Sequence, residues 1–370
     1  MPRAILLLAI GSLMLCQCVL KAQDGGLAPF TSATGRFMLF DHGRFVEHAA
    51  TPPQRILSHG DRLVYVDHDG ALRMFGSNGR TVTLDTVPGR EPVGSGHHVA
   101  WLAGTALKVA KANGAEVLTP DVGDFTVQDS LVAYHDLKEG ELRVWWRDRT
   151  ITVARVEQGA EAPQWEAGSN TVVFHDRSRR RVSFFHRGVV KLLFDSTDMA
   201  VVAAGGDMVA YWDDKGGVFR VWDRGKVVDL EQFRPVSFKV GDGVLAYVTH
   251  SGAFKVYRGG VARSMQKERP TDYWVQDHMV LFVHHGRLWS DALGSAAVIE
   301  RYVPEQWVVT GGTLTYLDLD RGIRLWSFGD RERIVAGMAT ERFERWGAVV
   351  LWKGPDGVVR CWWQDRLYEY

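Results

Sequence analysis

One sequence pattern recurs along most of this 370-residue chain and constrains its fold more than any other feature. In residues 208–222 a short apolar run ends in Tyr211, an acid follows at Asp213, a glycine turn comes next, and an apolar-basic-apolar-aromatic run ends at Trp222. The first-run aromatic recurs at Tyr65, Trp101, Tyr134, Phe174, Tyr211, Tyr247, Phe282, Tyr316 and Trp352. The steps are roughly 33 to 40 residues, with a mean of ~36, a period typical of an array of one supersecondary unit.

Each repeat predicts short β-strands joined by tight turns. Residues 209–212 and 219–222 are rich in β-forming residues, and the segment 213–217 between them has turn chemistry, so the pair should form a hairpin. A second turn at 223–225 leads to a third strand at 226–230. A fourth strand is expected where an aromatic or aliphatic residue stands about nine positions before the first-run aromatic. No stretch has a sustained period of 3.6, so helices should be nearly absent.

Four-stranded units repeated around a channel form a β-propeller. Aromatic residues at matching positions supply the apolar area that neighbouring blades hide from water. We therefore expect an all-β, single closed β-propeller of about eight to ten short blades, the range being open because the hairpin at 37–46 could be a truncated blade or a cap. The last unit, residues 351–370, offers three strands. The strand around Ile56 could be its fourth, so that the terminal strands close the ring and remove exposed edges.

The N-terminus has the form of an export signal. Arg3 precedes an apolar stretch over residues 4–20, and Ala22 is a small residue suited to cleavage, so residues 1–22 predict a secretory signal peptide and residues 23–370 the propeller. The apolar stretch is short for a membrane span, and no second one exists. The protein is expected to be exported, periplasmic or secreted, and soluble after cleavage. Lipidation at Cys16 or Cys18 is the alternative, although neither follows a small residue.

Part of this pattern resembles known propeller families. The Trp222-Asp223 dipeptide at the end of a strand resembles the signature of WD40 blades. The short blades and the export signal resemble bacterial exported propellers of the TolB or YVTN type. The resemblance covers nearly all of residues 23–370 in architecture and implies the propeller fold. The Gly-His pair of WD40 repeats does not stand at a regular position, so no functional residue is carried over.

Charge and cysteine content argue against general nucleic-acid binding and against a fold stabilised by disulfides. Without the signal the chain carries 42 basic and 44 acidic residues, because Arg3 and Lys21 leave with it, and this near-neutral balance gives no pull toward nucleic acid. Cys361 is then the only cysteine, so no intramolecular disulfide can form, and we expect a buried, inert thiol.

Several polar residues are candidates for a site. The repeated acids and bases are expected to be structural, because one site needs only one set of groups; they are Asp67, Asp136, Asp176, Asp213 and Asp318, with Arg73, Lys108, Arg143, Arg220, Lys255, Arg324 and Arg360. His135 and His175 share one register and could face the channel together, which makes them a candidate small-ligand site. Arg177, Arg179 and Arg180 cluster at a hairpin tip, either as a solvated turn or as a contact for an anion or acidic glycan.

The histidine pairs 97–98 and 284–285 predict no metal site. Neighbours on a strand point to opposite faces, so one pair cannot easily chelate an ion, and no metal or cofactor is expected. Known catalytic motifs are also missing, since the chain has no Gly-x-Ser-x-Gly, His-Glu-x-x-His, Walker or Cys-x-x-Cys sequence.

These observations favour a non-catalytic, monomeric binding or scaffold propeller. Its partner would be a protein, a peptide or a glycan held on one rim, with no nucleic acid and no membrane span. The alternative is a glycan-active hydrolase or lyase with carboxylates or histidines at the channel mouth.

Overall fold

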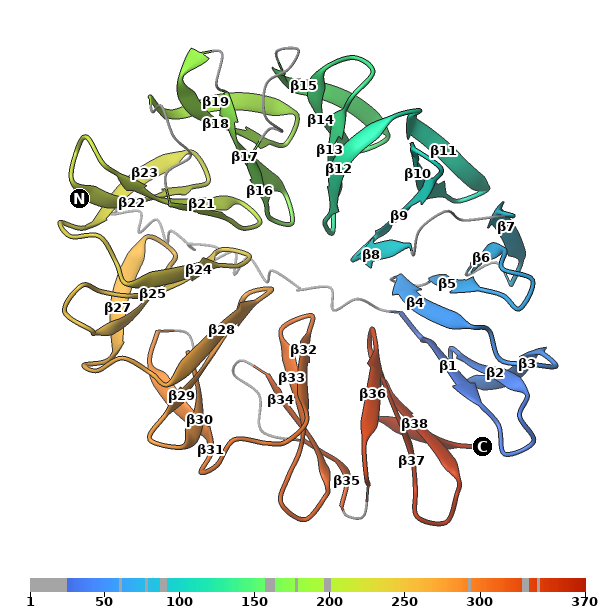
Figure 1. Ribbon diagram of the computed structural model, residues 1–370. Coiled ribbons are helices and arrows are strands. Elements are labelled where there is room, and N and C mark those ends of the chain that lie inside the picture. The colour runs from blue at the N-terminus through green and yellow to red at the C-terminus, as the bar shows by residue number, and fades with distance from the viewer. Residues whose placement is uncertain are drawn as a thin grey trace, which may run out of the picture.

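The computed structural model describes residues 25–59, 62–76, 79–86, 92–156, 164–176, 179–195, 201–291, 294–327, 333–337 and 340–370. Within these ranges the chain forms ten antiparallel sheets and no α-helix. The sheets follow one another around a central opening, so the predicted all-β closed propeller is confirmed and the number of blades is ten (Figure 1). None of these residues belongs to a helix long and apolar enough to cross a membrane.

Nine blades have four strands, which we call A to D from the channel outward. The A strands are β4 (Arg55–His59), β8 (Val93–Ser95), β12 (Val122–Val127), β16 (Trp165–Ala167), β20 (Val202–Ala204), β24 (Ser237–Val240), β28 (Asp272–Gln276), β32 (Trp307–Thr310) and β36 (Phe343–Trp346). The B strands are β5 (Arg62–Val66), β9 (His98–Ala103), β13 (Leu131–Asp136), β17 (Thr171–Asp176), β21 (Met208–Asp213), β25 (Val244–Val248), β29 (Met279–His284), β33 (Thr313–Leu317) and β37 (Val349–Lys353).

The outer strands complete the same nine blades. The C strands are β6 (Leu72–Phe75), β10 (Ala106–Lys111), β14 (Glu141–Trp146), β18 (Arg181–His186), β22 (Val218–Asp223), β26 (Phe254–Arg258), β30 (Arg287–Asp291), β34 (Ile323–Ser327) and β38 (Val359–Trp363). The D strands are β7 (Thr81–Asp85), β11 (Gly114–Thr119), β15 (Arg149–Arg155), β19 (Val189–Asp195), β23 (Lys226–Glu231), β27 (Val261–Gln266), β31 (Ala296–Glu300), β35 (Arg333–Ala336) and β39 (Arg366–Glu369). The first blade has β1 (Leu27–Thr31), β2 (Phe37–Asp41) and β3 (Arg44–Ala49).

Each of the nine four-stranded blades is one contiguous stretch of sequence, and this corrects the predicted closure. The strand nine residues before each first-run aromatic is the A strand of the same blade, as the pairing of Phe125 with Tyr134 shows. Ile56 therefore pairs with Tyr65 of its own blade, and the last blade has its own A strand, in which Phe343 pairs with Trp352. The leftover hairpin at 37–46 belongs to the first blade, for which the described residues supply three strands.

The ring closes by packing between the first and last blades. The rings of Phe40 and Trp363 lie 6.1 Å apart, and those of Phe30 and Tyr370 lie 5.2 Å apart. The Ala348 amide also donates a hydrogen bond of 3.3 Å to the Gly25 carbonyl oxygen. The seam is thus held mainly by aromatic side chains, and the sheets on its two sides remain separate.

Aromatic burial follows the predicted register on the B strands. Tyr65, Tyr134, Tyr211, Tyr247 and Tyr316 are all buried. On the C strands the prediction was correct for Phe75, Trp145, Trp222 and Tyr257, and too strong for Trp326 and Trp362, which are only partly buried. Rings from successive blades meet in these clusters, so the repeat supplies the interfaces between blades.

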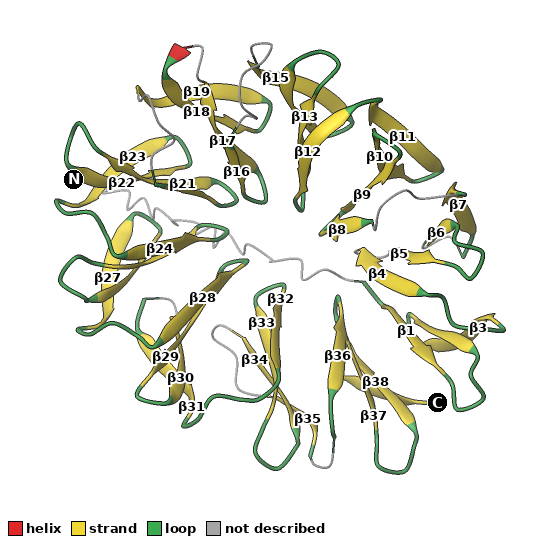
Figure 2. Ribbon diagram, in the orientation of Figure 1, coloured by secondary structure: helices red, strands yellow, loops and turns green. Residues whose placement is uncertain are grey.

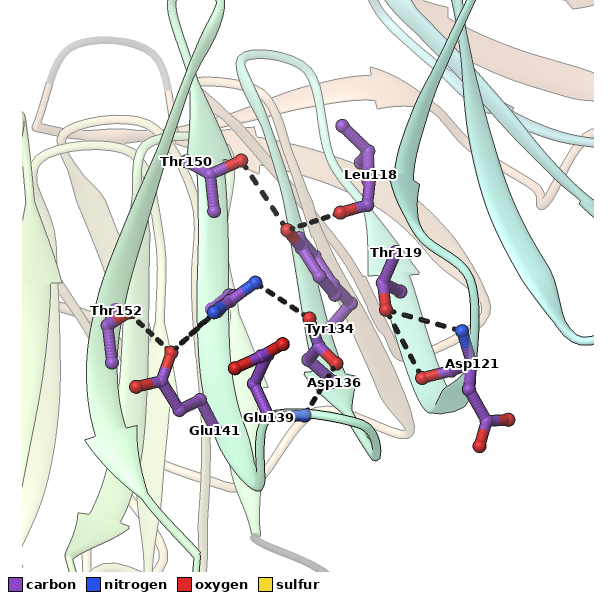
Figure 3. Close-up of polar contacts among 10 residues, drawn as sticks. Leu118, Thr119, Asp121, Tyr134, Asp136, Glu139, Glu141, Thr150 and Thr152 are labelled. Atoms are coloured by element: carbon purple, nitrogen blue, oxygen red, sulfur yellow. Dashed lines mark hydrogen bonds and ion pairs between the residues drawn. The ribbon is translucent and has the colours of Figure 1, made fainter.

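The repeated acid and base form a structural unit at the B–C turn (Figure 3). The Glu139 amide donates 3.1 Å to Asp136 Oδ1, and the Arg143 guanidinium donates 2.7 Å to Oδ2 of the same carboxylate. Tyr134 on the same strand donates a hydrogen bond of 3.4 Å to the Leu118 carbonyl of the preceding blade. The pairs Asp213–Arg220 and Asp318–Arg324 repeat this arrangement. These acids fold the turn, as predicted, and these bases pair with the acid of their own blade.

Candidate functional site

The antiparallel order of the blades separates two faces of the ring. A–B and C–D turns open on one face, which we call the A–B face. B–C turns and the links between blades open on the other, which we call the B–C face. The A–B turns lie next to the central opening, at the mouth of the channel (Figure 2).

At the channel mouth, A–B turns of different blades are linked by hydrogen bonds. We call these linked turns the collar. The Asp242 amide donates 2.5 Å to the Asp277 carbonyl oxygen of the next blade. The Ser169 hydroxyl donates to the Asp242 carboxylate two blades away. Burial raises the pKa of Asp277, and the carboxylates of Asp242 and Asp129 raise it further, although amides of the next turn oppose this shift. The collar is therefore tight and acidic, and like charges are held close together.

A cavity of about 690 Å³ lies on the A–B face between the β8–β11 and β12–β15 blades. We call it the inter-blade cavity. Its lining comes from two A–B turns and two C–D turns, and consists of Arg62, His97, His98, residues 110–115, Trp145 and Asp148. The lining thus combines an aromatic ring with cations, imidazoles and a carboxylate.

Lys111 and Trp145 organise the inter-blade cavity. Lys111 Nζ lies 4.6 Å from the centroid of the Trp145 ring, and the His98 ring meets the same indole edge-on at 4.8 Å. Lys111 also pairs with Glu116 at 2.8 Å and with Asp148. Burial lowers the pKa of Lys111, but hydrogen bonds to these two carboxylates outweigh it and the pKa is raised. Burial lowers the pKa of His98, which favours the neutral imidazole.

A second cavity of about 770 Å³ lies at the seam on the B–C face. It is lined by the ends of the first and last blades, including Phe30, Trp352 and Lys353, and by the acids Glu341 and Glu344. Glu344 accepts a hydrogen bond of 3.0 Å from the Trp346 indole. We call it the seam cavity.

The histidines predicted to share a site lie on neighbouring B strands. His135 on β13 is 7% exposed and His175 on β17 is 6% exposed. Burial lowers the pKa of His135. Gly123 leaves room for this ring, because a Cβ there would lie 3.0 Å from His135 Nδ1. Neither histidine lines one of the two cavities, and their role in ligand binding stays a prediction.

The predicted arginine cluster is partly described. Arg179 and Arg180 are exposed on a B–C turn, whereas Arg177 lies outside the described residues. Arg179 binds the buried carboxylate of Asp176 twice, through its amide at 3.2 Å and its guanidinium at 2.9 Å. Arg179 thus supports its own turn, and binding of an anion or acidic glycan here stays a prediction.

One group of potential metal ligands was missed by the sequence reasoning. Oxygen and nitrogen atoms of Glu268, His284 and His285 all lie within 4.8 Å of one another on the B–C face. The signal was present in the chain, because a histidine occupies the position of the repeated acid in this blade.

The fold and the turn chemistry define the class as a closed β-propeller of short blades whose recurrent charges are structural. A family model described as a 10-bladed beta propeller domain matches residues 21–368, and the chain belongs to that family. No curated protein sequence matches the chain significantly.

Solved structures similar to this chain are propellers of low sequence identity. The CRINKLY WD40 ectodomain of the Arabidopsis thaliana receptor kinase ACR4 is 12% identical, with a TM-score of 0.38, and the match covers 76% of this chain and 98% of that one. Apo AztD from Citrobacter koseri is 15% identical, with a TM-score of 0.35 and coverages of 75% and 95%. The computationally designed Ika8 protein is 16% identical, with a TM-score of 0.35 and coverages of 74% and 95%.

Proposed function

We propose that this protein is an exported, non-catalytic binding propeller that holds a carboxylate-bearing peptide segment of a protein partner on its A–B face. The observation that carries the proposal is the inter-blade cavity, where Lys111, Arg62 and two histidines surround a mixed polar and apolar space. Cavities with a few convergent polar groups are the usual sites for ligands.

The state of Lys111 supports an anionic group in the partner. Its present partners are exposed, with Glu116 at 42% and Asp148 at 75% of their side-chain surface. Exposed ion pairs contribute little stability, typically about 0–1 kcal/mol, so a carboxylate from a partner can replace them at small cost. Arg62, which also lines the cavity, adds a second cation for the same group.

Among the possible partners, a peptide fits better than a glycan. A sugar ring gains contact area by lying on an open aromatic face. Trp145 is only 1% exposed, and Lys111 and His98 cover it. The cavity therefore offers hydrogen-bonding and charged groups around a closed indole, which suits a side chain and its peptide backbone.

A second candidate function rests on the seam cavity. Glycoside hydrolysis needs two carboxylates about 5 to 10 Å apart across a pocket, and the seam cavity presents Glu341 and Glu344. The glycan-active alternative could therefore use the seam cavity as well as the channel mouth. Turnover of a polysaccharide panel that is lost in Glu341→Gln and Glu344→Gln would establish it.

The binding proposal is tested by capture from cell-envelope extract with a matched pair of charge reversals. Lys111→Glu should lose the partner that the wild type retains, whereas Lys215→Glu, on an exposed B–C turn, should retain it. The captured partner's binding segment, made as a synthetic peptide, should bind the wild type and not Lys111→Glu. Equal binding by all three proteins, or binding that survives amidation of every carboxylate in the peptide, would contradict the proposal.

Export is tested separately, because the signal at 1–22 lies outside the described residues. The mass of the protein recovered from the cell envelope or medium should correspond to a chain that begins after Ala22. A full-length chain in the cytoplasm contradicts export.

A further inference from the structure

We propose that Glu268, His284 and His285 form a binding site for a divalent transition-metal ion of the zinc type on the B–C face. Two imidazoles and one carboxylate are a ligand set that suits Zn²⁺, with a fourth position left for water. The site is independent of the proposed peptide site, which lies on the opposite face.

Local backbone geometry brings the two histidines together. His284 is the last residue of β29, and His285 begins the two-residue turn to β30. On a regular strand the two side chains would point to opposite faces. His285 and Gly286 both have positive φ values, 51° and 71°, so the alternation ends at this turn. The imidazole centroids lie 4.0 Å apart as a result.

The third ligand comes from another blade. Glu268 follows β27, the D strand of the preceding blade, in the link that leads to β28. Its carboxylate approaches the two imidazoles, and all three ligand atoms lie within 4.8 Å. Metal–ligand distances of about 2.0–2.2 Å at a tetrahedral centre require ligand atoms about 3.3–3.6 Å apart. Glu268 and His285 are exposed, so their side chains are free to close the remaining gap.

This blade lacks the acid–base pair that forms the B–C turn in several other blades. Asp136 stands two residues after Tyr134, and Arg143 faces Tyr134 across the ladder. In this blade His284 stands two residues after Phe282, and Trp289 faces Phe282. The structural acid–base pair is therefore replaced by a histidine and a tryptophan, and the turn is shortened to two residues.

The three side chains have no other polar partner among the described residues. Their contacts are with one another, through the two tilted imidazoles and the nearby carboxylate. Other histidines differ, since His48 bonds the Tyr65 hydroxyl at 2.9 Å and His186 bonds Asp207 at 2.9 Å.

The test is a titration of the tag-free mature chain with CoCl₂, followed by displacement with ZnCl₂. The wild type should bind one Co²⁺ with the visible absorption of a tetrahedral centre, and Zn²⁺ should remove the signal. Glu268→Gln and His285→Ala, both changes at exposed side chains, should each weaken Zn²⁺ binding by at least about tenfold. Binding should also weaken as pH falls through the histidine range, because protons compete for the imidazoles.

The matched control is His250→Ala. His250 is exposed on the B–C turn of the preceding blade and stacks on Phe233 at 5.7 Å, and it belongs to no ligand group among the described residues. This variant should bind metal as the wild type does. The proposal is overturned if His250→Ala loses binding equally, or if the wild type binds Zn²⁺ no more tightly than the His285→Ala variant. Urea unfolding of each variant confirms that the fold is retained.

Discussion

Replacing Trp222 with alanine tests whether inter-blade aromatics stabilise the ring. Trp222 on β22 is 5% exposed. Its ring lies 4.6 Å from Phe184 and 4.9 Å from His186, both on β18 of the preceding blade. A buried tryptophan removes about 200 Å² from water, worth about 5 kcal/mol at ~25 cal/mol per Å². Alanine retains part of this area, so we expect Trp222→Ala to lower the free energy of unfolding by about 3–5 kcal/mol.

A variant at the same register provides the comparison. Trp362 on β38 stands where Trp222 stands in its blade, but it is only partly buried. Trp362→Ala should therefore lower the free energy of unfolding by less, about 1–2 kcal/mol, because Trp362 buries less apolar area than Trp222 does. The measurement is urea unfolding followed by far-UV circular dichroism, with the slope m checked for constancy. Equal losses in the two variants, or a loss below about 1 kcal/mol for Trp222→Ala, would refute the link between burial and register.

Three further outcomes follow from single side chains. Asp136 is 1% exposed and accepts hydrogen bonds from an amide and from Arg143, so Asp136→Asn should cost about 1.5–3 kcal/mol in urea unfolding, and a neutral result would contradict its structural role. The pKa of the Asp277 carboxyl is raised in the folded chain, so the folded protein binds this proton more tightly than the unfolded chain does. The wild type therefore loses stability as pH rises from about 3.9, the ordinary pKa of aspartate, through the raised value. Asp277→Asn should therefore be the more stable protein at pH 7, with a gain in melting temperature that disappears near pH 3; a pH-independent difference would contradict this. Cys361 is fully buried and burial raises its pKa to about 12, so a thiol reagent at pH 8 should label it only after unfolding, and rapid labelling of the native chain would show that the thiol is accessible.

Local spacing was enough to predict the architecture from the sequence. Hairpin turns and a period of ~36 residues indicate which strands pair within a unit, because these contacts are close along the chain. The partner of the strand at Ile56 was less certain. The position of this strand in the sequence allows it to pair either with the last blade or with the strand that follows it. In the structure Ile56 pairs with Tyr65 of the following strand, across a short A–B turn.

The candidate sites depend on relations that the repeat does not encode. The inter-blade cavity joins His98 to Trp145 of the next blade, and the metal ligands join Glu268 to the next blade's histidines. The prediction that neighbouring histidines diverge was based on strand geometry and fails where φ becomes positive at His285. The usable signal was the departure from the repeat at His284, where five other blades carry an aspartate.

The contiguity of each blade has a consequence for folding kinetics. The ladders formed by the described residues all join strands that are neighbours along the chain, so these sheets can form after closing only short loops. Chains rich in such local contacts fold faster than all-β proteins with distant strand pairs. Nucleation could start in any blade and spread to its neighbours, as in other linear repeat arrays. The ring would then be completed last, when Phe40 and Trp363 meet.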